Sequence, residues 1–71
     1  MTNTLELKAA MVRKGMTAET LADTIGISSQ SLSYKVNNKR EFTSSEIANI
    51  SIALGLSIAE RDLIFFGTEV E

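Results

Sequence analysis

Three of the four glycines are each followed two residues later by threonine or serine: Gly15 by Thr17, Gly26 by Ser28, and Gly55 by Ser57. Glycine adopts the left-handed conformation that ends a helix, and a Thr or Ser side chain caps the first amides of the next one. Proline is absent from the chain. This pattern therefore predicts short helices joined by tight turns.

Apolar residues between these breaks recur every three or four positions, which is typical of amphipathic helices. We expect helices over about 5–14, 18–25, 28–37, 43–54 and 58–66, the fourth opened by the capping box "TSSE". The loop "NNKREF" precedes it, and Asn38 can turn the chain there because asparagine tolerates positive φ. The predicted fold is all-α, a compact five-helix bundle forming one domain over residues 1–71, with the last four residues loose. The expected core is Leu7, Ala10, Met11, Leu21, Ala22, Ile25, Leu32, Val36, Ile47, Ile50, Ala53, Leu54, Leu63 and Phe66.

The composition argues against an enzyme. The chain has no cysteine and no histidine, so disulfides, thiolate metal sites and histidine general bases are excluded, and no metal or cofactor is expected. The acids are better explained as helix caps and helix starts. No apolar run approaches the ~20 residues of a membrane helix, and the N-terminus is unlike a signal peptide. We expect a cytoplasmic protein.

The charges are unevenly distributed along the chain. The net charge of −2 argues weakly against nucleic-acid binding, for which a basic balance is expected. From Ser28 to Arg40, however, the only charged residues are Lys35, Lys39 and Arg40, whereas the segment from Glu60 onward is mainly acidic. Ordinary surface variation would give the same split, so a motif has to decide between the two interpretations.

The segment 17–36 has the pattern of a helix-turn-helix. Ala22 is small where the second helix must approach, Gly26 supplies the turn, and Ile27 can fill the angle between the helices. In the second helix only Leu32 and Val36 are apolar anchors. At ~100° per residue, five polar residues cover one arc of about 140°, and the two anchors lie to one side of it. The arc contains Ser29, Gln30, Ser33, Tyr34 and Asn37. Buried anchors behind hydrogen-bonding groups are what a helix entering the major groove requires.

The stretch "TAETLADTIGISSQSLSYKVNNKREF" resembles the lambda-repressor and Cro-like helix-turn-helix domains. The similarity covers nearly the whole chain, from a first helix ending in "KGMT" through a helix ending in "ALGLS" to a final short helix. The resemblance implies a five-helix bundle that binds operator DNA, usually as a dimer. It also implies base contacts at the positions of Ser29, Gln30 and Tyr34, to which the polar arc adds Ser33. Gln30 is the strongest candidate, since an amide can pair bidentately with adenine.

Phosphate contacts are expected around this helix. The start of the second helix is an anion site, and the loop after the third supplies donors and charge. The expected phosphate-contacting residues are Thr17, Ala18, Glu19, Asn37, Asn38, Lys39, Arg40 and Ser44.

The chain departs from the usual family pattern at several positions. Met11 and Val36 stand where many members carry an arginine–glutamate ion pair, so we expect these two side chains to touch. Asn38 replaces the usual glycine, and Ala18 replaces a frequent glutamine that contacts phosphate. Lys35 occupies a position that is often apolar.

The segment "LIFF" suggests self-association. If Leu63 and Phe66 face the core, Ile64 and Phe65 lack an obvious partner within the chain and would form a homodimer interface. The alternative is that the core takes all four. A two-fold dimer would place its recognition helices about 34 Å apart, one turn of DNA.

These features lead to two competing functions. The first is a sequence-specific regulator of transcription that binds double-stranded operator DNA, a phage-type repressor or Cro-like protein. The second is a protein-binding module of the same fold, such as an antitoxin or anti-repressor partner. Neither a membrane nor a small-molecule ligand is expected.

Overall fold

The computed structural model describes residues 1–67, which form five α-helices and no strand. They are α1 (Thr4–Lys14), α2 (Ala18–Ile25), α3 (Ser29–Val36), α4 (Ser44–Leu54) and α5 (Ile58–Phe65). The predicted all-α five-helix fold is confirmed. The expectation of a loose C-terminus concerns residues 68–71, which lie outside the described part of the chain.

The helix ends follow the caps expected from the sequence. Thr17, Ser28, Thr43 and Ser57 each accept a hydrogen bond from the amide three residues on. Gly15, Gly26 and Gly55 end α1, α2 and α4 in the left-handed conformation. Because both signals are local in sequence, they place the helix boundaries to within one or two residues.

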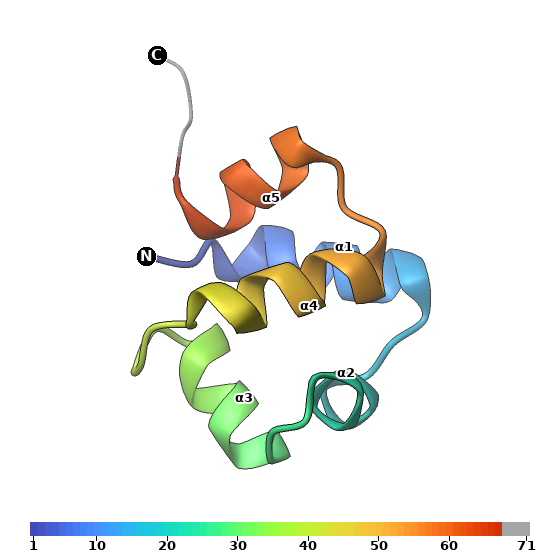
Figure 1. Cartoon of the computed structure of the whole chain (residues 1–71), viewed down its shortest axis with the longest axis vertical. Coiled ribbons are helices and arrows are strands. Elements are labelled where there is room, and N and C mark those ends of the chain that lie inside the picture. Colours follow the sequence, from blue (N-terminus) through green and yellow to red (C-terminus); the bar gives the residue numbers. More distant parts are fainter. Residues whose placement is uncertain (68–71) are drawn as a thin grey trace.

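The helix-turn-helix occupies one end of the molecule (Figure 1). Helices α2 and α3 lie at one end of the longest axis and α5 lies at the other, while α4 crosses the middle in front of α1. α2 packs against both α3 and α4, and α5 packs against α1 and α4. The helix predicted to read DNA is therefore remote from α5.

The core joins all five helices. Its fully buried large side chains are Leu7, Leu21, Leu32, Ile50 and Ile64, one from each helix. Burial of each such side chain stabilises the fold by roughly 1.5–3 kcal/mol. Met11 and Val36 belong to the same buried cluster, as the replacement of an ion pair by apolar residues requires; their direct contact stays a prediction.

The prediction for α5 is wrong in its register. Ile64 and Phe65 are buried, with 2% and 6% of their surface exposed, whereas Phe66 is 53% exposed. The Phe65 ring meets Phe42 edge-on, with centroids 5.4 Å apart, and the amide of Asn3 donates to the carbonyl of Ile64 at 2.6 Å. Ile64 and Phe65 thus have partners inside the chain and do not form a surface patch for a second copy.

No helix among residues 1–67 is long and apolar enough to cross a membrane.

Candidate nucleic-acid interface

The turn between α2 and α3 is closed by backbone hydrogen bonds. The amides of Gly26 and Ile27 both donate to the carbonyl of Ala22, at 2.9 and 3.0 Å, and Gly26 has a φ of +82°. Ala22 is buried where the helices meet, and Ile27 packs against the core. Leu32 and Val36 anchor α3 from within, as the sequence predicts. The inward side of α3 therefore packs into the hydrophobic core.

The outward side of α3 carries the predicted base-reading residues. Ser29, Gln30, Ser33 and Tyr34 are all exposed, Tyr34 to 41% of its surface. Gln30 donates from Nε2 to the Tyr34 hydroxyl at 3.3 Å, one helical turn away. This contact orients the amide but uses one of its two N–H groups, so the Gln30 carbonyl and the other N–H remain available. The structure gathers these four residues on an accessible face; their contacts to DNA stay a prediction.

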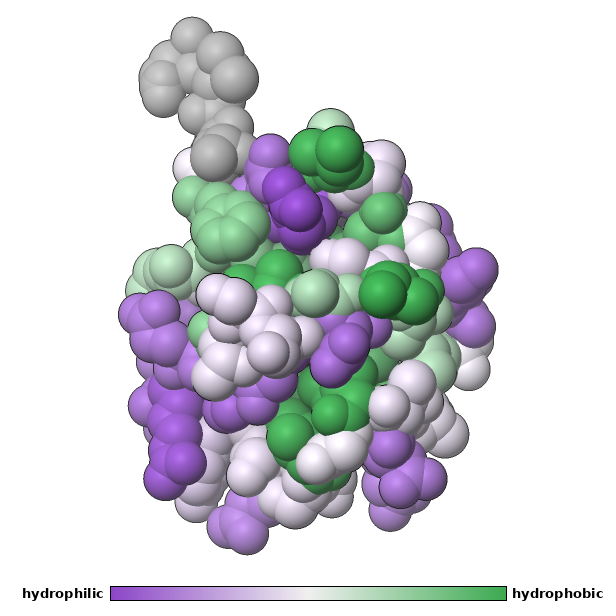
Figure 2. Space-filling model, in the orientation of Figure 1, coloured by the Kyte–Doolittle hydropathy of each residue, from purple (hydrophilic) through white to green (hydrophobic). Residues whose placement is uncertain are grey.

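The surface at this end of the molecule is mostly polar. On the face shown in Figure 2, hydrophilic and intermediate residues predominate around α2 and α3, with hydrophobic residues at the centre. A shallow hollow of about 420 Å³ lies between these helices and is lined in part by Glu19, Asp23, Ser28 and Ser29. The two carboxylates give the hollow beside α3 a negative charge, which would repel a phosphate backbone.

At the start of α2, the backbone supplies the available donors. The Thr17 amide donates to Thr20 Oγ1 at 2.9 Å, and the Thr17 hydroxyl accepts from the Thr20 amide at 3.1 Å. Ala18 and Glu19 come next; both residues are exposed, and their amides have no partner within the helix. An anion would therefore meet the amides of Ala18 and Glu19, whereas the polar groups of Thr17 are engaged in the cap.

The two asparagines after α3 are engaged within the chain. Asn37 donates from Nδ2 to the Ser33 carbonyl at 2.9 Å. Asn38 adopts the expected positive φ, +64°, and its side chain pairs with the backbone of Thr2: Oδ1 accepts from the amide at 2.8 Å, and Nδ2 donates to the carbonyl at 2.9 Å. Its Nδ2 also lies 3.5 Å from Thr4 Oγ1, so the Asn38 side chain is engaged within the chain; its contact with phosphate stays a prediction.

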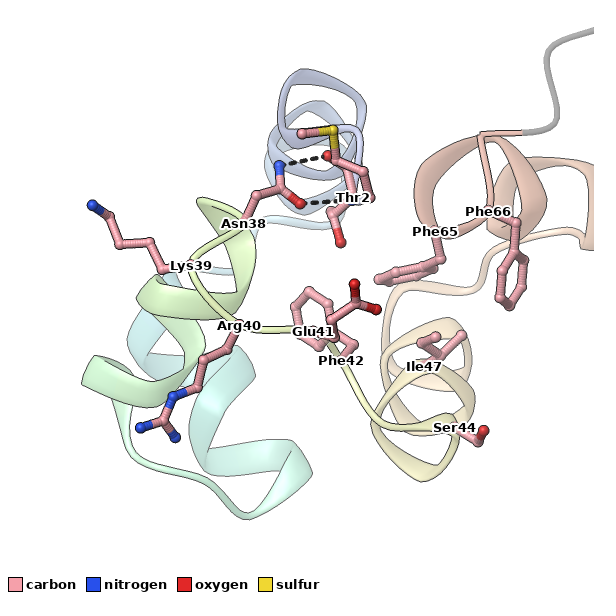
Figure 3. Close-up of a pocket in the computed structure, with 11 residues that line it drawn as sticks. Thr2, Asn38, Lys39, Arg40, Glu41, Phe42, Ser44, Ile47, Phe65 and Phe66 are labelled. Carbon is pink, nitrogen blue, oxygen red and sulfur yellow. Dashed lines mark hydrogen bonds between the residues drawn. The ribbon is translucent and has the colours of Figure 1, made fainter.

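The loop cations remain free for a partner (Figure 3). Lys39 and Arg40 are exposed and form no ion pair with any other described residue. Both point away from an open hollow of about 640 Å³, whereas Glu41 points into it. Phe42, Ile47, Phe65 and Phe66 line that hollow. Ser44 is exposed at the start of α4. Lys39 and Arg40 therefore contribute to the lining of the hollow, while their charged ends are directed away from it.

One feature of the site was not predicted, an ion pair that joins α3 to α4. Lys35 Nζ lies 2.6 Å from Glu46 Oε2, and the two side chains are only 12% and 13% exposed. Lys35 follows Leu32 by three residues, so it shares the side of α3 that faces the fold. A lysine in that position needs a partner, which is the signal that could have revealed the pair.

Glu46 is held as a carboxylate by its surroundings. Partial burial acts to raise its pKa, but the hydrogen bonds from Lys35 and Thr43 and the charge of Lys35 together outweigh burial. The net result is a pKa below the ordinary value of 4.5. Both oxygens are in use, since Oε1 accepts from the Thr43 amide at 2.9 Å. The ion pair and the helix cap thus share one carboxylate.

Within residues 1–67, no group of three or more Asp and Glu side chains is arranged to hold a metal ion.

Comparison with known proteins agrees with this geometry. A family model described as helix-turn-helix matches residues 7–61, which include all of α2, α3 and α4. Searches of curated proteins and of solved structures found no match to the chain. The match covers most of the chain and contains the turn, the exposed face of α3 and the loop cations. The chain belongs to the lambda-repressor/Cro-like helix-turn-helix family, a family of DNA-binding regulators.

Proposed function

We propose that this protein is a sequence-specific regulator of transcription, of the repressor or Cro type, which reads an operator through the major groove. The observation that supports this proposal most strongly is that α3 has both a buried apolar face and an exposed polar face. Leu32 and Val36 are buried, while Ser29, Gln30, Ser33 and Tyr34 are exposed on the arc of the helix next to these anchors. A helix with this layout at one end of a compact domain can enter a groove without unfolding any of the core.

Gln30 is the principal reader in this proposal. Its free carbonyl and remaining N–H match the N6 and N7 groups of adenine, a pairing worth roughly 1–3 kcal/mol of discrimination. The hydrogen bond to the Tyr34 hydroxyl already restricts the orientation of the Gln30 amide. Less conformational entropy is therefore lost when Gln30 pairs with a base. Ser29 and Ser33 are less selective, because a hydroxyl can donate to or accept from any base edge.

Phosphates would be held around the reading face. The amides of Ala18 and Glu19 present a helix N-terminus, Lys39 and Arg40 supply charge, and Ser44 adds a hydroxyl at the start of α4. Each neutralised phosphate contributes about −0.9 to the slope of log K against log salt. With two free loop cations and two nearby acids, we expect a shallow slope and weak nonspecific binding.

Binding as a homodimer is part of the proposal. Operators with two-fold symmetry are read by two recognition helices one DNA turn apart. Ile64 and Phe65 are core residues and cannot form the interface, but Phe66 beside them is exposed. Sedimentation equilibrium with and without a symmetric operator tests this point, and a single copy per selected site would contradict it.

A protein-binding module of the same fold is the second candidate. The observation in its favour is the acidic pair Glu19 and Asp23 at the edge of α3. Such a surface would suit a basic protein partner better than a duplex.

Selection from random duplexes separates the two candidates. The full chain is incubated at low salt with a random-sequence duplex library, and the bound fraction is amplified and sequenced over several rounds. We expect a short enriched motif with two symmetric halves. A pool that stays random at low salt would contradict sequence-specific reading and favour the protein-binding module.

A further inference from the structure

The ion pair Lys35–Glu46 differs from the other ion pairs in the described chain. Arg13–Glu60 is 3.7 Å long with half-exposed side chains, and Arg61–Asp62 joins neighbours in sequence. Lys35–Glu46 is shorter, at 2.6 Å, largely buried, and links two helices. Exposed pairs add little to stability, so among the ion pairs of residues 1–67 only Lys35–Glu46 has the geometry of a defined restraint.

The apolar attachment of α3 does not define its rotation well. α3 packs chiefly against α2, through a seam in which only Leu32 and Val36 are buried. Apolar contacts are non-directional, so a narrow seam tolerates rolling of a helix about its own axis. A rotation of ~20° would move a side chain 5–6 Å from that axis by about 2 Å. A displacement of that size breaks a base hydrogen bond.

The carboxylate of Glu46 provides a fixed point against that rotation. Its Oε1 is held by the Thr43 amide in the capping box that starts α4, which leaves Oε2 directed at Lys35. Charge-assisted hydrogen bonds are short and directional. Lys35 directly follows Tyr34 in α3, so fixing Lys35 also fixes the direction in which Tyr34 and Gln30 point.

We propose that Lys35 and Glu46 are positioning residues that set the rotation of α3 and thereby the base selectivity of the domain. The inference rests on the proposed DNA reading. It agrees with the general behaviour of buried ion pairs, which contribute less to stability than their contacts suggest and in some proteins select one arrangement. Lys35 acts through Glu46 and does not itself touch DNA.

The test uses three variants of the full chain. Lys35→Met removes the charge and keeps the side-chain length. Glu46→Gln keeps one oxygen for the Thr43 amide but leaves no second oxygen for Lys35. Arg13→Met is the control, because it breaks the exposed pair with Glu60 at the other side of the bundle. All measurements are made well below the melting temperature of the least stable variant.

The first readout needs no DNA. Residual dipolar couplings of the backbone amides report the orientation of α3 relative to α1 and α4. We expect Lys35→Met and Glu46→Gln to change the couplings of α3 and leave the other helices unchanged, while Arg13→Met changes none. Unchanged α3 couplings in both variants would overturn the proposal, whatever happens to the melting temperature.

The second readout compares the selected duplex with a scrambled one of the same length. We expect Lys35→Met and Glu46→Gln to bind the selected duplex about tenfold more weakly, with affinity for the scrambled duplex and the salt slope unchanged. An equal loss for both duplexes, with the salt slope of Lys35→Met reduced by about one, would identify Lys35 as a phosphate contact and overturn the proposal. If the unmodified chain selects no duplex, the proposed DNA-binding function is wrong. The residual dipolar couplings of α3 would still test whether Lys35 and Glu46 set the rotation of this helix.

Discussion

The two ends of α3 are attached to the rest of the molecule in different ways. The C-terminal end is tied from two directions: Thr4 Oγ1 donates to the Val36 carbonyl at 2.6 Å, and Lys35 reaches Glu46. Just beyond it, Asn38 is paired with Thr2. Among the described residues, no side chain in the first turn of α3 is hydrogen-bonded to another helix: the Ser28 hydroxyl accepts from the Ser31 amide at 3.0 Å, and the turn before it is closed on the Ala22 carbonyl. We call the C-terminal end of α3 the held end, because contacts from α1 and α4 fix it. The N-terminal end is the presented end, because its polar side chains are exposed.

This difference separates exposed side chains that are free from those that are not. Asn38 and Gln30 are both exposed amides, and solvent accessibility alone would treat them alike. Asn38 uses its side chain to fasten the N-terminal segment, whereas Gln30 keeps hydrogen-bonding capacity for a ligand. The hydrogen-bond inventory of a surface, and not its exposure, identifies the residues able to read a partner.

The largest expected effect on stability comes from Leu32, the buried residue between the two ends of α3. Leu32→Ala removes a fully buried side chain of α3, and we expect a loss of about 2–5 kcal/mol in the free energy of unfolding. Ser33→Ala, its exposed neighbour, should change stability by no more than about 0.5 kcal/mol. Urea denaturation followed by circular dichroism measures both. Equal losses would show that α3 is not anchored as described.

The held end should be sensitive to loss of the carboxylate of Glu46. Glu46→Ala leaves Lys35 largely buried without its partner and removes one half of a capping box, for which we expect about 1–3 kcal/mol. In the double variant Lys35→Met/Glu46→Ala, part of this loss should be recovered, since no unpaired charge remains. A double variant that is less stable than Glu46→Ala would refute the coupling between the two residues.

Asn38 should matter for folding and not for phosphate binding. Asn38→Ala loses the pairing with Thr2 and strains a backbone with φ of +64°, so we expect a loss of about 1–2 kcal/mol. Asn38→Gly relieves the strain and should cost less. The affinity for a duplex of scrambled sequence, measured by fluorescence anisotropy, should be unchanged in both. A lower affinity in both variants would identify Asn38 as a phosphate contact.

Acidification should weaken the held end through Glu46. Because its pKa in the folded protein lies below the ordinary value of 4.5, the unfolded chain binds more protons in acid. The contribution of Glu46 is therefore present above about pH 4.5 and is lost as the pH falls through its folded-state pKa. Glu46→Gln should lose less stability than the unmodified chain between pH 5 and 3, as followed by urea denaturation. Parallel pH profiles would contradict the assignment.

The smallest effect on stability is expected at the presented end. Gln30→Ala removes an exposed side chain, so the free energy of unfolding should change by no more than about 0.5 kcal/mol. The same change should relax selectivity at one base pair of the half-site. Asn49→Ala, an exposed amide on α4, is the matched control and should leave the selected motif unaltered. A motif unchanged by Gln30→Ala would remove Gln30 from the reading face.

The structural features that depend only on residues close together in the sequence could be predicted from it. The turn at Gly26, the cap at Ser28 and the buried anchors Leu32 and Val36 are local signals, and the structure contains them all. The polar arc of α3 follows from the same periodicity. The helix-turn-helix and its exposed face could therefore be located before any coordinates were known.

Contacts between residues that are far apart in the sequence could not be predicted from local sequence patterns. The partners of Ile64 and Phe65 are Asn3 and Phe42, which precede them by more than twenty residues, so the register of α5 could not be inferred. The pairing of Asn38 with Thr2 spans 36 residues. Glu46 was correctly predicted as half of a capping box, but only the packing of α3 beside α4 shows where its second oxygen points.

Binding of a selected operator duplex, followed by nuclear magnetic resonance, tests the central claim most directly. Titration of the isotope-labelled chain should give saturable shifts for the backbone and side-chain signals of Ser29, Gln30, Ser33 and Tyr34, with smaller shifts at the start of α2 and at Lys39 and Arg40. Signals of α5 should move least on each protein copy, apart from any at a dimer interface. Shifts that avoid the exposed face of α3, or fail to saturate, would contradict the reading of DNA by this helix.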